Sequence, residues 1–165
     1  MEKSDYTGPD LRHLEVLANM ARLGRSTIVL ATGVWDILHS GHIRYLHDAA
    51  KLGDTLFVGV DSDDLVRRTK GPNRPILPEN ERWEAVNSLK DVDVAFVFGS
   101  LAPVINVIKP DFLVVSPTTK DASSDLGDRY ELAQRNNVQI VSVPSRSGTH
   151  TSGIVDSILS RFGSR

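Results

Sequence analysis

Short, strongly apolar runs alternate along the chain with segments of helical period, and this alternation constrains the fold more than any other feature. Val, Ile, Leu and Phe fill the runs with little polar alternation, as in strands buried on both faces of a parallel sheet. The five predicted strands cover residues 27–32, 55–60, 94–98, 112–115 and 139–143. Strands and helices that take turns along a chain predict an α/β fold with an open, doubly wound, Rossmann-like parallel sheet.

The intervening segments repeat apolar side chains every three or four residues, which is typical of amphipathic helices. One helix is predicted before the first strand, at residues 10–23, where Gly24 follows as a stop signal. The other predicted helices cover residues 41–52, a short segment from 62, 79–89, 102–108, 127–135 and 151–161. In such folds ligands bind beyond the carboxyl ends of the strands, so we expect the loops after strands to carry the chemistry.

Length and composition indicate one globular domain. The chain has 165 residues, 40% of them hydrophobic, which is enough for one core, and no segment resembles a linker. We expect a flexible leader over residues 1–10 and a single domain over 11–165. The absence of cysteine excludes disulfides, thiolate zinc sites and cysteine nucleophiles.

Charge and hydropathy restrict the partners. Nineteen basic against twenty-one acidic residues give a net charge of −2, which does not suit a dedicated nucleic-acid binder. Any site for a polyanion must therefore be local. Neither a signal peptide nor a membrane-spanning segment is visible, so we expect a cytoplasmic protein that does not bind membranes.

Two histidines flank Ser-Gly where the first strand gives way to a helix, in the segment His39-Ser40-Gly41-His42. Gly33 and Gly41 allow close approach of the backbone to a ligand, and the amides and dipole at a helix start favour a phosphate. Imidazoles can donate hydrogen bonds to phosphate oxygens. A single histidine here would more often be a helix cap, but the pair together with two glycines favours phosphoryl-type chemistry, which depends on positioning and fixed donors.

Two further segments could bind anions. Four cations within eight residues, including Arg68, Lys70 and Arg74, precede a predicted helix; such clusters are usually solvated surface. Hydroxyl residues at 149–152 open the last helix, where they can cap the helix and also bind a phosphate.

Residues 32–63, TGVWDILHSGHIRYLHDAAKLGDTLFVGVDSD, resemble the cytidylyltransferase-like family and in particular its ADP-heptose synthase branch. That branch shows TNGxFDxLHxGH, then LGD, VGVxSD, RxKG and RP, and relatives carry GxSTTxI at the last helix. The resemblance runs from about residue 11 to 159. It implies transfer of AMP or CMP from ATP or CTP to a phosphorylated acceptor, with release of pyrophosphate and with help from Mg²⁺.

The resemblance also implies residue roles. The expected catalytic residues are His39, His42 and Lys70. The expected nucleotide-binding residues are Thr32, Gly33, Val34, His39, Gly41, His42, Asp61, Arg82, Gly148, Thr149, Thr151 and Ser152. The expected acceptor-binding residues are Asp36, Arg68, Arg74 and Lys120. Metal ligands are not assigned, and Arg82 could instead form a surface ion pair.

The chain departs from the branch after the fourth strand, where residues 114–121 read VVSPTTKD in place of VKGGDY. Lys120 could replace the missing lysine, but Pro117 imposes a different backbone. We therefore expect a changed acceptor pocket. At the start of the last helix, His150 replaces a serine of the GxSTTxI pattern.

These observations favour a nucleotidyltransferase that uses ATP in preference to CTP and acts on a sugar phosphate such as heptose 1-phosphate. One alternative is a CTP-dependent cytidylyltransferase for glycerol phosphate or another polyol phosphate. Another is a nucleotide-binding module without catalysis, in which the altered loop has lost acceptor binding. A homodimer is compatible with the sequence, although nothing in it shows an interface.

Overall fold

A parallel sheet of five strands forms the centre of the molecule, in the order β3-β2-β1-β4-β5. The computed structural model describes residues 8–116, 125–144 and 148–163. The strands are β1 (Ile28–Gly33), β2 (Thr55–Asp61), β3 (Val94–Phe98), β4 (Phe112–Val115) and β5 (Gln139–Ser142). The chain proceeds outward from β1 through β2 to β3, then continues on the other side of β1 with β4 and β5. The predicted doubly wound sheet is confirmed, with its switch point between β1 and β4.

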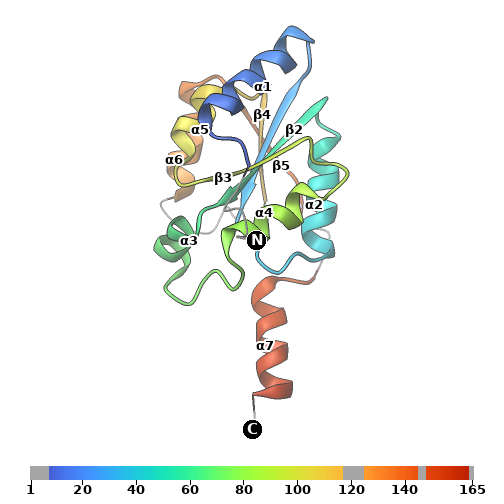
Figure 1. The fold of residues 1–165 in the computed structure, drawn as a ribbon, viewed down its shortest axis with the longest axis vertical. Coiled ribbons are helices and arrows are strands. Elements are labelled where there is room, and N and C mark those ends of the chain that lie inside the picture. Colours follow the sequence, from blue (N-terminus) through green and yellow to red (C-terminus); the bar gives the residue numbers. More distant parts are fainter. Residues whose placement is uncertain (1–7, 117–124, 145–147, 164–165) are drawn as a thin grey trace, which may run out of the picture.

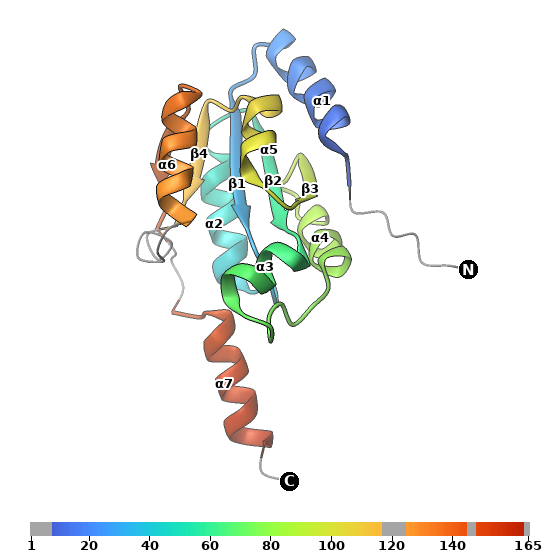
Figure 2. The same cartoon turned by 90° about the vertical axis from the view of Figure 1, so that its left-hand side faces the viewer.

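Helices cover both faces of this sheet (Figures 1 and 2). Their bounds are α1 (Leu11–Leu23), α2 (Ser40–Ala50), α3 (Asp63–Lys70), α4 (Glu79–Asn87), α5 (Leu101–Ile108), α6 (Asp125–Arg135) and α7 (Thr151–Phe162). Helices α1, α5 and α6 pack on one face and α2 and α4 on the other. Helix α7 extends away from the sheet, and none of its residues is buried. None of the helices described is long and apolar enough to cross a membrane.

Burial of β1 on both faces explains the absence of polar alternation in its sequence. Ile28 and Leu30 belong to the core beneath α1, α5 and α6, while Val29 and Ala31 belong to the core beneath α2 and α4. All four side chains are fully buried. Because both faces are covered, successive residues must all be apolar. The polar side chains of this part of the chain consequently lie at the strand ends or beyond them.

Helices α1 and α3 each begin one residue later than predicted, because the predicted first residue is the N-cap and lies outside the helix. Asp10 accepts a hydrogen bond from the His13 amide as N-cap of α1, and Ser62 accepts one from the Leu65 amide as N-cap of α3. Residues 1–7 of the predicted leader lie outside the described residues. Gly8 packs closely against the Ala95 carbonyl and the Trp83 indole, where a Cβ atom would lie 2.6 Å from both.

Candidate active site

A cavity of about 290 Å³ opens beyond the carboxyl ends of β1 and β4, at the switch point of the sheet. The loop after β1, the start of α2, the end of α3 and the start of α7 all contribute to its wall. This is the position at which open α/β sheets bind ligands. A cavity of the structure therefore lies where the site is predicted.

His39 has two roles at the floor of the cavity, as helix cap and as potential donor. It is the N-cap of α2, and its Nδ1 accepts a hydrogen bond of 3.1 Å from the Gly41 amide. An imidazole that accepts at Nδ1 must, when neutral, carry its proton at Nε2. His39 therefore presents an Nε2–H donor beside the amides at the N-terminus of α2.

His42 stacks on His39, with ring centroids 3.9 Å apart, and meets the edge of Trp35 at 5.5 Å. Burial, reinforced by the neighbouring His39, lowers the pKa of His42 to about 4. Burial also lowers the pKa of His39, with His150 contributing in the same direction. The Nδ1 atom of His42 is buried and has no hydrogen-bond partner among the described residues. At neutral pH both imidazole rings are therefore uncharged, and each can donate a hydrogen bond to a ligand.

The loop between β1 and α2 is held in a strained conformation. Trp35 and Ile37 have φ angles of 55° and 49°, in the left-handed region that costs non-glycine residues energy. The Trp35 indole donates to the Gly59 carbonyl at 2.9 Å, and the Thr151 hydroxyl donates to the Asp36 carbonyl at 2.8 Å. A Cβ atom on Gly33 would lie 3.1 Å from the Trp35 ring, so glycine here accommodates the indole.

Asp36 organises the loop from inside. Its carboxylate is 1% exposed, accepts hydrogen bonds from the Ile76 and Leu77 amides at 2.8 and 3.0 Å, and pairs with Arg74 at 3.0 Å. Asp36 borders the cavity. That Asp36 binds the acceptor stays a prediction; in the structure both of its carboxylate oxygens accept hydrogen bonds from the segment after α3.

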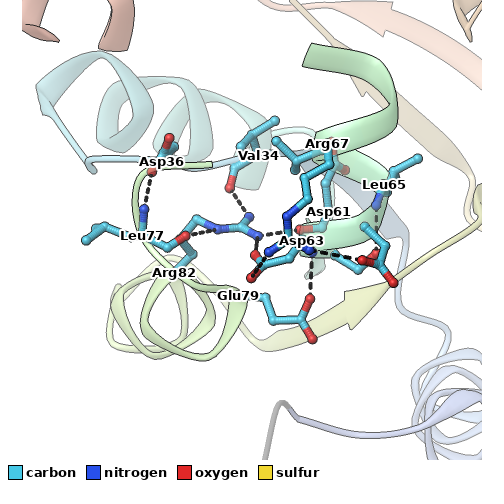
Figure 3. Close-up of polar contacts among 12 residues, drawn as sticks. Val34, Asp36, Asp61, Asp63, Leu65, Arg67, Leu77, Glu79 and Arg82 are labelled. Carbon is cyan, nitrogen blue, oxygen red and sulfur yellow. Dashed lines mark hydrogen bonds and ion pairs between the residues drawn. The ribbon is translucent and has the colours of Figure 1, made fainter. Parts of the chain in front are cut away.

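Arg82 is a fully buried residue, and the structure places it outside the lining of the cavity, where we predicted a contact with the nucleotide. The guanidinium donates to three carbonyls and to the Asp63 carboxylate at 2.7 Å (Figure 3). The carbonyls are those of Val34, Asp61 and Leu77. One side chain therefore joins the loop after β1, the end of β2 and the start of α4.

Many of the predicted residues do meet at the cavity. Those lining it are Thr32, Gly33, Val34, Asp36, His39, Gly41, His42, Lys70, Arg74, Thr151 and Ser152. The structure thus brings together three sequence segments that are separated by up to about a hundred residues. The stacked histidines, the end of α3 and the start of α7 all border the same cavity.

Other predicted residues lie elsewhere. Asp61 is buried at the end of β2, and Arg68 points to the Gly99 carbonyl at 3.4 Å on another surface. Gly148 and Thr149 precede the residues of α7 that reach the cavity and do not line it. None of these four residues lines the cavity, so the structure does not bring them to the predicted site. Lys120 lies outside the described residues.

The sequence did not single out several lining residues as binding residues. Tyr45, Ser116, Arg129 and His150 all line the cavity. Tyr45 lies one turn after His42 on α2, so helical spacing from the histidines could have found it. Arg129 carries no local signal, because it reaches the cavity from α6. His150 was noted only as a departure from the family pattern.

The cavity carries an excess of positive charge. Lys70, Arg74 and Arg129 are its cationic lining residues, and Asp36 is the one carboxylate among the described residues that line it. The whole chain, in contrast, has a net charge of −2. Local concentration of cations with helix amides favours binding of a polyanion such as a triphosphate.

The donor set does not fit a Mg²⁺ ion held by the protein alone. Mg²⁺ prefers oxygen ligands, and in nucleotide sites it commonly binds substrate phosphates. Within the described ranges no group of three or more acidic or histidine side chains could hold a metal ion. Asp36, the carboxylate at the cavity, is already bonded to amides and to Arg74.

Titration of His42 offers a direct check of the site. We expect an NMR midpoint for His42 near pH 4, against an ordinary value of 6.5. Because its pKa is lower in the folded than in the unfolded state, the unfolded chain takes up the proton first, so this contribution to stability is present above pH 6.5 and is lost as pH falls toward 4.

Added ATP should raise the His42 midpoint, since a phosphate favours the charged ring. The resonance of His47, on the same helix but outside the cavity, serves as the reference. A His42 midpoint at its ordinary value, or one that nucleotide leaves in place, would contradict the buried phosphate-binding role.

Comparison with known proteins places this geometry in a family. A family model described as cytidylyltransferase-like matches residues 30–156. The bifunctional protein HldE of Syntrophotalea carbinolica is 36% identical over 157 residues, which cover 90% of this chain and 30% of that protein. HldE of Helicobacter pylori is 43% identical over 112 residues, 67% of this chain and 24% of that protein. The chain thus spans less than a third of these curated relatives.

Solved structures share the fold. A structure described as the lipopolysaccharide core biosynthesis protein from Thermoplasma volcanium superposes with a TM-score of 0.60 at 32% identity, covering 75% of this chain and 99% of that one. A protein of unknown function from Archaeoglobus fulgidus gives a TM-score of 0.56 at 25% identity, covering 72% of this chain and 99% of that one.

Proposed function

Because this chain belongs to the cytidylyltransferase-like family, we propose that it is a nucleotidyltransferase that joins a nucleoside monophosphate to a phosphorylated small molecule. The observation that carries the proposal is the stacked pair of neutral histidines at the N-terminus of α2, inside a cavity with excess positive charge. Fixed donors of this kind stabilise charge that develops on a phosphoryl group.

The proposed reaction is an in-line displacement. An oxygen of the acceptor phosphate attacks the α-phosphorus of the nucleoside triphosphate and forms a new P–O bond. The bond from the α-phosphorus to the bridging oxygen breaks, and pyrophosphate leaves with that electron pair. Both phosphate groups are already ionised at neutral pH, so no protein nucleophile or general base is required.

The described residues supply positions and donors for this step. The Nε2–H of His39 and the ring of His42 donate to oxygens of the α-phosphate beside the amides of α2. Lys70 at the end of α3 is exposed and flexible, and such an ammonium can follow the charge that moves onto pyrophosphate. Arg74 is oriented by its ion pair with Asp36 and binds substrate at the same wall of the cavity.

ATP and a sugar 1-phosphate such as heptose 1-phosphate are the proposed substrates. They rest on the resemblance to the ADP-heptose synthase branch and on the similarity to HldE proteins. A CTP-dependent reaction with glycerol phosphate is the alternative within the same chemistry. The replaced residues after β4 are the reason to test acceptors broadly.

A substrate panel tests this function. Purified protein is incubated with Mg²⁺, one of ATP, CTP, GTP or UTP, and one of heptose 1-phosphate, glucose 1-phosphate or glycerol 3-phosphate, and pyrophosphate release is measured. We expect release with ATP and heptose 1-phosphate together and none when either is omitted. Release with CTP but not ATP would contradict the base preference. Nucleotide binding without release for any pair would favour the non-catalytic module.

A further inference from the structure

Arg129 approaches the cavity from the opposite side of the sheet to the histidines. It belongs to α6, which packs with α1 and α5 on one face, whereas α2 lies on the other (Figure 2). Its Nη1 atom donates to the Thr32 hydroxyl at 2.8 Å, across 97 positions of the sequence. Thr32 lies near the end of β1, and both residues line the cavity. A cation from the far layer is thereby held at the mouth of the site.

The charge of Arg129 acts within the cavity rather than only on the outer surface. Tyr45 of α2 is buried at the cavity wall, and burial raises the pKa of its hydroxyl. Arg129 opposes that shift by lowering the same pKa. Since Tyr45 and Arg129 come from helices on opposite faces, this interaction passes over the end of β1. A ligand between them would lie next to the guanidinium.

The chemistry of the side chain selects its ligand. A guanidinium presents five donors in a planar fork, which matches two oxygens of a phosphate. The hydrogen bond to Thr32 orients one arm of the fork. The carboxylate at the cavity, Asp36, is bonded to Arg74 and to two backbone amides. Asp36 is thus bonded on the side of the segment after α3, and Arg129 brings a further guanidinium to the cavity wall.

We propose that Arg129 binds a phosphate oxygen of a substrate and is a specificity-determining residue outside the short motifs that carry the family resemblance. The proposal rests on the proposed function and deepens it. It also bears on the departure after β4, where the sequence lacks the lysine of VKGGDY: Arg129 brings a cation to the cavity from helix α6. The phosphate could belong to the nucleoside triphosphate or to the acceptor, and the experiment separates these sources.

Binding measurements with four variants test the proposal. Calorimetry is done with α,β-methylene-ATP, which cannot be cleaved between the α- and β-phosphates, and separately with heptose 1-phosphate. We expect Arg129→Gln to weaken one of these ligands by about tenfold or more, and Arg129→Lys and Thr32→Val by less, since they keep the charge but lose the oriented fork. Arg135→Gln, on the exposed side of the same helix, is the matched control and should bind as wild type.

The source of the phosphate follows from which ligand is affected. Weaker binding of the nucleotide analogue alone assigns Arg129 to the triphosphate, and weaker binding of heptose 1-phosphate alone assigns it to the acceptor. Unchanged affinity for both, within about twofold, in a folded Arg129→Gln protein would overturn the proposal. Thermal melting establishes folding. If Arg129→Gln does not fold, Arg129→Lys decides, and unchanged affinity in that variant overturns the proposal.

Failure of the Arg129 proposal can be distinguished from failure of the proposed function. The nucleotide titration requires no turnover, so Arg129-dependent binding without release of pyrophosphate would remove the enzymatic proposal and leave this one. If the wild type and Arg129→Gln turn over substrate equally, the enzymatic proposal stands and the Arg129 proposal is removed.

Discussion

Replacing His42 by alanine should lower kcat by about 10²- to 10³-fold, the loss typical of a removed transition-state donor. The ring of His42 stacks on His39 and borders the cavity, with a buried Nδ1 that has no partner in the described part of the chain. A donor used mainly in the transition state affects kcat more than binding of the ground state. Rates of pyrophosphate release and nucleotide affinity, measured separately, check this distinction.

His39 requires a variant that spares its structural role. Alanine would remove the cap of α2, which costs about 1 kcal/mol, as well as the donor at Nε2. Asparagine also accepts at an N-cap, so His39→Asn keeps the helix start and loses the imidazole. We expect its melting temperature to stay near that of the wild type while kcat falls as for His42→Ala.

His47→Asn is the matched control for both histidine variants. His47 lies on the same helix but is exposed and pairs with Asp91 at 2.9 Å. Its replacement should change kcat by less than about twofold, as expected for a surface position. If His42→Ala and His39→Asn retain wild-type kcat, the histidine pair is not catalytic, and the proposed chemistry fails.

Replacing Arg82 by methionine should destabilise the protein by about 3–5 kcal/mol, as when one partner of a buried charged network is removed. Methionine fills much of the volume but leaves three carbonyls and the Asp63 carboxylate without their donor (Figure 3). Each buried acceptor left unsatisfied adds to the cost. The free energy of unfolding, from urea denaturation at neutral pH, measures the effect.

Arg67→Met is the comparison for Arg82. Arg67 is half exposed and pairs with Asp63 at 3.6 Å and with the exposed Asp64 at 3.0 Å. Such surface pairs contribute about 0–1 kcal/mol, so this variant should unfold near the wild-type midpoint. An Arg82→Met protein that is as stable as Arg67→Met would show that the buried contacts contribute little.

Arg82 also connects stability to the site. Its bond to the Val34 carbonyl holds the start of the loop that contains the left-handed Trp35 and Ile37. Loss of this bond should release the strained loop and displace His39 at its end. We therefore expect any folded Arg82→Met protein to lose activity, although Arg82 itself touches no substrate.

The sequence alone determined the fold class and the central part of the site. Periodicity is a local property, and strands buried on both faces must be apolar throughout, so strands and helices could be predicted to within a few residues. Residues such as His39 and His42 lie on one short segment, and parallel strands place the loops at their carboxyl ends along one edge. The meeting of that segment with Lys70 and Thr151 followed from topology.

Tertiary structure alone decided which way the charged side chains point. Arg82 reaches 48 positions back to Val34, and Arg129 reaches 97 positions back to Thr32. Asp36 likewise accepts hydrogen bonds from the Ile76 and Leu77 amides, about 40 positions further along the chain. Such bonds join residues far apart in the chain, and a charged side chain has the same local sequence whether it is buried as a structural link or exposed to a ligand. Only the packing of the helices against the sheet decides whether a charged side chain is a buried structural link or is exposed to a ligand.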